Sequence, residues 1–129
     1  MWYGIFFMIA FLLPAAVAAV IAATHLVFGG REIVRPLLRH AALPPVVTLT
    51  HYYCWHMVTI TLAGLIGAYT YAALAPDGHA LAVVATLLSG LFCLWGLALV
   101  LWKRQRHRDM PQWILFAMLT ASGVWALAS

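Results

Sequence analysis

Charged residues divide this chain into four long stretches that contain no Asp, Glu, Lys or Arg. The stretches cover residues 1–30, 40–76, 78–102 and 110–129. A helix that crosses a bilayer needs roughly 20 consecutive apolar residues. Three of the stretches are therefore long enough for one span each. The second stretch is too long for one helix and too short for two, so it predicts a connector ending at Pro44-Pro45 and then a helix.

The pattern predicts an all-α, polytopic membrane protein: an antiparallel bundle of four transmembrane helices in one domain, residues 1–129. The expected helices cover residues 3–28, 48–74, 80–102 and 111–127, with an amphipathic interfacial segment at 31–40. Composition strengthens this prediction, because 66% of the residues are hydrophobic and only 8% are charged. Such a chain cannot cover the surface of a water-soluble globule. A cytosolic enzyme, a secreted disulfide scaffold and a nucleic-acid-binding domain are excluded.

The basic residues predict the orientation of the bundle. All seven lie in two connectors: Arg31, Arg35 and Arg39 in the first, and Lys103, Arg104, Arg106 and Arg108 in the third. The middle connector, residues 75–79, has none. The positive-inside rule therefore places the first and third connectors in the cytoplasm and both termini outside. The same seven side chains are expected to contact anionic lipid headgroups.

His25, His56 and Glu32 are the candidate ligands of a functional site. Ionisable groups inside a membrane are costly and usually functional, and both histidines are expected in the cytoplasmic leaflet. His25 and Glu32 are seven residues apart, nearly two full turns at about 100° per residue. They share a face if the first helix continues past Gly29-Gly30. Two imidazoles and a carboxylate suit a transition metal, and two imidazoles from different helices suit haem b.

Three neighbours on the second helix, His51, Tyr52 and Thr59, are candidates to hydrogen-bond and orient these ligands. His51 is five residues from His56, about 140° around a helix. In a regular helix these two histidines therefore cannot both face one site. The spacing of the candidate ligands contains neither the zinc motif HExxH nor the haem-attachment motif CxxCH.

A purely structural role is the alternative interpretation of these residues. The two intramembrane histidines could hydrogen-bond each other or Glu32 and fasten the inner end of the bundle. Glu32 also has Arg35 and Arg39 at helical spacings that allow ordinary ion pairs.

Several short motifs stand out in the inner half of the chain: Thr24-His25, Gly29-Gly30-Arg31-Glu32, Arg35-Pro36-Leu37-Leu38, the run from Tyr52 to Thr59, and Pro111-Gln112-Trp113. With these motifs the chain resembles a group of small, uncharacterised four-helix proteins of the bacterial inner membrane. The resemblance implies that location and one polar site in which Gln112 joins His25, Glu32 and His56. It implies no reaction, because no activity is assigned to the group.

Two functions are therefore predicted. The first is a small integral membrane protein whose His/Glu site in the cytoplasmic leaflet binds a metal or haem, with any redox chemistry belonging to that cofactor. The second is a non-catalytic accessory or assembly subunit of a larger membrane complex. The expected partners are the lipid bilayer and another membrane protein or a second copy of the chain. Nucleic acid is not among them, and whether any reaction is catalysed stays open.

Overall fold

The computed structural model describes residues 2–129, with side chains from Ile9 onward. Within that part the chain is helical and has no strand. The elements are α1 (Trp2–Thr24), the π-helix η1 (His25–Val34), α2 (Arg35–Arg39), α3 (Pro45–Leu74), the 3-10 turn η2 (Pro76–Gly78), α4 (His79–Trp102) and α5 (Gln112–Ala128). Three helical segments, Ile9–Arg39, Pro45–Leu74 and Pro76–Trp102, are long and apolar enough to cross a membrane, and α5 is a shorter apolar helix. The predicted all-α class is confirmed.

The first helical rod is longer than predicted. The sequence placed its end at residue 28, but α1, η1 and α2 follow one another without interruption to Arg39. The expected interfacial segment at 31–40 is therefore largely a continuation of this rod. The π-helix ends where its hydrogen bonding must stop: the Arg35 N–H donates to the Gly30 carbonyl, and the next residue, Pro36, has no N–H to donate.

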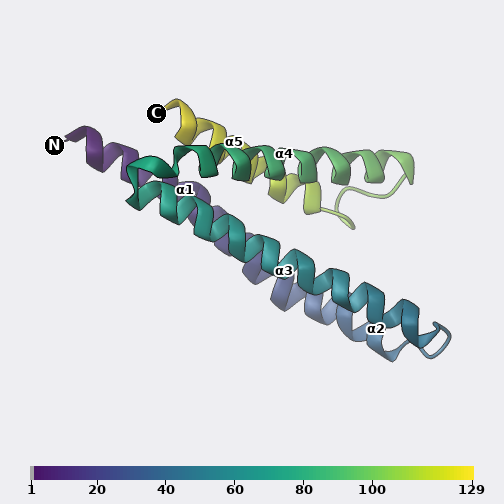
Figure 1. Cartoon of the computed structure of the whole chain (residues 1–129). Coiled ribbons are helices and arrows are strands. Elements are labelled where there is room, and N and C mark those ends of the chain that lie inside the picture. The colour runs from purple at the N-terminus through teal and green to yellow at the C-terminus, as the bar shows by residue number, and fades with distance from the viewer. Residues whose placement is uncertain (1) are drawn as a thin grey trace.

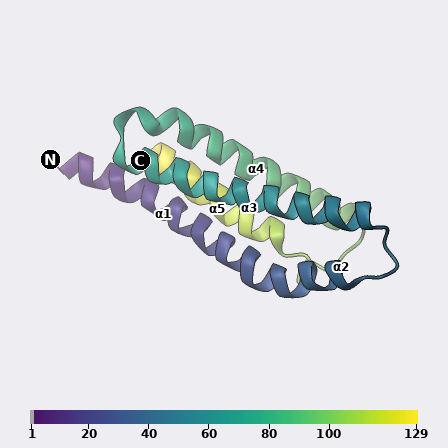
Figure 2. The ribbon, with the colours of Figure 1, turned by 60° about the horizontal axis from the view of Figure 1, so that its bottom comes forward.

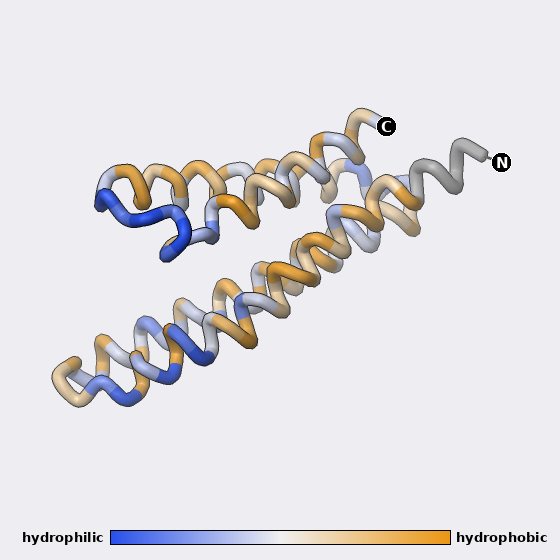
Figure 3. The backbone as a smooth tube through the Cα atoms, turned by 180° about the vertical axis from the view of Figure 1, so that it is seen from behind, coloured by the Kyte–Doolittle hydropathy of each residue, from blue (hydrophilic) through white to orange (hydrophobic). Residues whose placement is uncertain are grey.

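The helices form two antiparallel hairpins, α1–η1–α2 with α3 and α4 with α5 (Figures 1 and 2). Figure 3 shows that the hairpins lie together at one end and diverge toward connectors 40–44 and 103–111. We call this open end the basic end, because the Lys and Arg residues lie in or near these connectors. The opposite end is the closed end. The molecule is thus shaped like a V.

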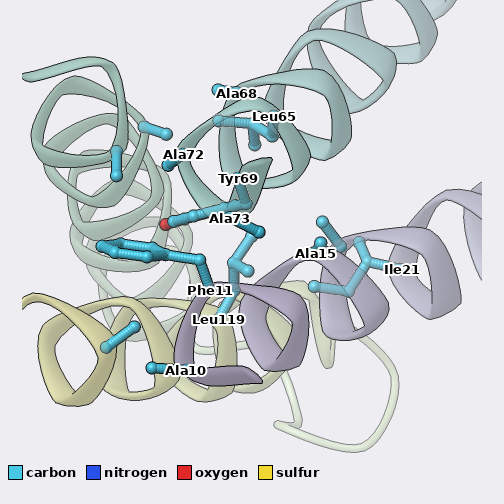
Figure 4. Packing of buried hydrophobic residues seen from close by; sticks show 14 of the residues in the cluster. Ala10, Phe11, Ala15, Ile21, Leu65, Ala68, Tyr69, Ala72, Ala73 and Leu119 are labelled. Carbon is cyan, nitrogen blue, oxygen red and sulfur yellow. The ribbon is translucent and has the colours of Figure 1, made fainter. Parts of the chain in front are cut away.

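The buried core lies at the closed end, where small side chains allow the helices to approach closely (Figure 4). Its members include Ala10, Phe11, Ala15, Ala18, Leu65, Ala68, Tyr69, Ala72, Ala82, Ala85, Leu119 and Ala126. By contrast, no residue from 22 to 61 is buried. Not every small residue takes part in this packing, because Gly64 and Gly67 of α3 face open space.

One hydrogen bond joins α3 and α4 inside this core, in a space that α5 leaves open. The Thr86 hydroxyl donates to the Ala82 carbonyl at 2.8 Å. Because its single proton is used there, the hydroxyl accepts from the Tyr69 hydroxyl, at 3.0 Å. Gly123 of α5 leaves the space that both oxygens occupy, since a Cβ at this position would lie 2.5 Å from the Thr86 oxygen. The contact is internally satisfied and therefore structural.

Candidate functional site

A cleft of about 490 Å³ opens between the two hairpins toward the basic end. Its size lies within the roughly 300–1,000 Å³ typical of small-molecule sites. Residues of α1, η1, α3 and the start of α5 form its walls, together with the end of the third connector. The apolar wall residues include Ile21, Leu62, Leu115 and Phe116, and the polar ones are Thr24, His25, Glu32, Arg108, Asp109 and Gln112. We call this space the polar chamber.

A second chamber of about 270 Å³ lies next to the first, between α3, α4 and the start of α5. Its surface is almost entirely apolar, so we call it the apolar chamber. Four residues line both chambers: Val58, Leu62, Gln112 and Phe116. The two chambers are therefore adjoining parts of one cleft.

The His25 side chain is held by two contacts with α3. Its ring stacks on the Trp55 indole, with ring centroids 3.7 Å apart and planes 17° from parallel. Its Nε2 lies 3.1 Å from the Thr59 Oγ1. The Thr59 hydroxyl also lies 3.2 Å from the Trp55 carbonyl, so these two residues of α3 hold the face and the edge of the imidazole.

Gly29 makes the stack on Trp55 possible. A Cβ at Gly29 would overlap the Trp55 ring, whereas a Cβ at Gly30 would meet nothing within 4 Å. Sequence reasoning did not find Trp55 as the partner of His25. The available signal was a glycine one turn after His25, opposite an aromatic residue one turn before Thr59.

Glu32 carries an unpaired carboxylate. It is exposed at the wall of the polar chamber, and it makes no ion pair within the described part of the chain. The expected pairs with Arg35 and Arg39 do not form. A spacing of three or seven residues aligns side chains in an α-helix, but the wider turn of η1 rotates Arg35 away from that alignment.

The structure brings together only part of the predicted site. His25, Glu32 and Gln112 line one chamber, and Thr59 holds His25. His56 does not line it: its ring is exposed and meets the edge of Tyr52, with centroids 4.6 Å apart.

His51 also has a local partner rather than a place in the cleft, because its Nδ1 donates to the Val47 carbonyl at 2.7 Å. Among the residues that the structure describes, no three His, Cys, Asp or Glu side chains gather closely enough to hold a metal ion.

The seven basic residues predicted to contact headgroups lie in or near the connectors of the basic end, and all seven are exposed. Asp109 pairs with Arg106 at 3.7 Å and with Arg108 at 3.5 Å. The Lys103 ammonium lies 3.8 Å from the centroid of the Trp102 ring. Arg108 and Asp109 also line the polar chamber, a position that the sequence did not predict.

The polar chamber contains groups that can accept hydrogen bonds from a cation. The Glu32 carboxylate and the Gln112 carbonyl are acceptors, and the His25 imidazole lines the same space. Two of the three acidic residues of the chain, Glu32 and Asp109, line this one space. In comparisons with known proteins, no family model, curated protein or solved structure matches the chain. The residues that line the polar chamber are therefore the main indication of function.

Proposed function

We propose that the chain is an integral protein of the bacterial inner membrane, with its basic end in the cytoplasm and both termini outside. The seven basic residues gathered toward one end of the V support this orientation. The 30 residues of α3 extend for about 45 Å, more than the roughly 30 Å hydrocarbon layer. The α1–α3 hairpin would therefore tilt or project from the layer, which places Arg35 and Arg39 among the headgroups.

We further propose that the polar chamber binds a cationic ligand at the depth of the cytoplasmic leaflet. One observation carries this proposal: the Glu32 carboxylate, which has no ion pair among the described residues, lines the same chamber as the His25 imidazole. A carboxylate placed at the edge of a low-dielectric layer has a strong preference for a positive partner. Gln112, on the opposite hairpin, supplies a third polar group.

The sequence predicted that the bound ligand is a transition metal or haem b. For a metal, His25 and Glu32 would be the two protein ligands, and because no third His, Cys, Asp or Glu among the described residues gathers with them, water would complete the coordination. For haem, His25 is the histidine of the chamber that would hold the iron, because His56 does not line the chamber. An ammonium group is the other cation that these acceptors suit.

The test is a ligand inventory of protein extracted from native membranes in polymer nanodiscs. An absorption spectrum, metal analysis and native mass spectrometry are run on the wild type, Glu32→Gln and His25→Ala. We expect a bound ligand of one of these kinds in the wild type and its loss in both variants. His56→Ala is the matched control for His25→Ala, because His56 is exposed outside the chamber. Asp77→Asn is the control for Glu32→Gln.

The ligand inventory distinguishes a bound cofactor from an empty site. A Soret band or a stoichiometric metal that depends on His25 would identify the cofactor. A wild-type protein that carries no metal, no chromophore and no bound small molecule would refute the cation site.

An accessory or assembly subunit is the second candidate function. The favouring observation is the arm formed by residues 22–61, in which no side chain is buried although many are large and apolar. A partner helix lying against this arm would cover them. Chemical cross-linking in native membranes should then give a discrete heteromeric product. Recovery of monomer alone, or of a homo-oligomer, would contradict this role.

A further inference from the structure

We infer that the ligand of the cleft is a diacyl phospholipid with a primary amine in its headgroup. The ammonium would lie against Glu32 and His25, the phosphate near Arg108, and the two acyl chains in the two chambers. This inference rests on the proposed cation site and names the class of molecule that occupies it.

The polar chamber has the right set of groups for a zwitterionic headgroup. A primary ammonium has three N–H donors, and the chamber offers the Glu32 carboxylate and the Gln112 carbonyl as acceptors beside the His25 imidazole. Arg108 supplies a guanidinium for the phosphate, although it shares its charge with Asp109 at 3.5 Å. A purely anionic headgroup would instead face Glu32 and Asp109 without an ammonium to balance them.

The apolar walls of the cleft suit acyl chains. A metal ion would leave both chambers largely empty and would make no contact with their apolar walls. The chambers total about 760 Å³ from 490 and 270 Å³, and Phe116 lines both of them. A glycerol backbone beside Phe116 would allow one chain to enter each chamber.

The location also fits this ligand. The cleft opens toward the basic end, where the proposed orientation places the cytoplasmic headgroups. A lipid could therefore enter sideways between the diverging hairpins without leaving its leaflet. Its burial would also cover apolar side chains that the protein leaves exposed, among them Val58, whose exposed fraction is 44%.

The experiment compares lipids retained by the protein in nanodiscs made from equal parts of phosphatidylethanolamine, phosphatidylcholine and phosphatidylglycerol. Native mass spectrometry then identifies the lipid that stays bound after detergent release. We expect phosphatidylethanolamine to be enriched about threefold over phosphatidylcholine, the effect of a net hydrogen bond, and at least as strongly over phosphatidylglycerol, which has no cation to pair with Glu32. Phosphatidylcholine is the informative competitor, because it keeps the positive charge but has no N–H donor.

Two variants test the two halves of the site separately. Glu32→Gln should abolish the preference for phosphatidylethanolamine while lipid is still retained. Val58→Trp should reduce all lipid retention, because Val58 lines both chambers. The matched control is Ile60→Trp on the same helix, where the exposed fraction is 71% and the residue lines neither chamber.

The outcomes distinguish this inference from the cation site itself. Equal retention of the three lipids by the wild type, or a preference for phosphatidylglycerol, would overturn the inference. A metal bound through Glu32 and His25 would also overturn it, yet would uphold the cation site. Retention that is unchanged in Val58→Trp would show that the bound lipid lies elsewhere, which equally contradicts it.

Discussion

At the scale of single residues, glycines decide how closely the helices of this protein approach. Gly29 makes room for the Trp55 ring, and Gly123 makes room for the Tyr69–Thr86 hydrogen bond. Gly64, by contrast, has nothing within 4 Å of the position of a Cβ. The same residue type therefore has very different tolerance to substitution along this chain.

Gly123→Ala is expected to destabilise the closed end. Its methyl group would collide with the Thr86 and Tyr69 oxygens, and overpacking of this kind costs about 1–3 kcal/mol. Thermal unfolding in detergent should show a melting temperature several degrees below that of the wild type. Gly64→Ala is the matched control and should melt at or slightly above the wild-type temperature, because alanine favours helix without a clash. Equal melting temperatures for the two variants would contradict the packing at Gly123.

At the scale of elements, the π-helix η1 sets the positions of the site residues. An α-helical continuation would align Glu32 with Arg35, whereas the wider turn leaves Glu32 unpaired. The segment also holds the two glycines, the first of which faces Trp55 on α3. π-helical segments are rare and frequently occur at functional sites, which agrees with the role proposed for this one.

Gly29→Ala should displace Trp55 and so remove the stack on His25. In the wild type the indole lies 3.7 Å from the imidazole, and its ring current shifts the imidazole proton resonances upfield. NMR of histidine-labelled protein in micelles should show these resonances returning toward ordinary positions in Gly29→Ala. Gly30→Ala, the adjacent control, should leave them where they are, because its methyl group enters open space. An unchanged spectrum in both variants would mean that the stack is absent in solution.

At the scale of the whole molecule, the protein is firmly joined at one end and open at the other. The core residues belong to the closed end, and the cleft lies between the hairpins as they diverge. This arrangement allows a ligand site near the basic end without disturbing the packing that holds the helices together. The charge distribution along the same axis defines the proposed orientation in the membrane.

The proposed orientation depends in part on the four basic residues of the third connector. Replacing them should change the signals of reporter proteins fused to the chain. Alkaline phosphatase fused after Ser129 should be active outside the cytoplasm, and a fluorescent protein fused there should be dark. Replacing Lys103, Arg104, Arg106 and Arg108 by glutamine removes about 1 kcal/mol of headgroup attraction per residue. The fusions should then report mixed orientations. Full cytoplasmic fluorescence of the unmodified chain fused after Ser129 would reverse the proposed topology.

The amino-acid sequence by itself determined the helical class, the approximate helix boundaries and the separation of charge along the molecule. These properties follow from spacing and composition: charge-free stretches of spanning length have few other structures available. The helix from 79 to 102 begins and ends within one residue of its predicted bounds. The first helix was predicted too short, because Gly29-Gly30 resembles a helix terminus and nothing local shows that the helix continues.

Only the tertiary structure decided which polar residues share a site. The sequence placed His25, His56 and Glu32 in the same leaflet, but depth does not determine the direction of a side chain. Rotation about α3 turns Trp55 and Thr59 toward His25 and leaves His56 exposed. The divergence of the hairpins, and with it the cleft, depends on where small residues allow contact between distant segments. Those contacts lie far apart in the sequence, so no local pattern could have shown them.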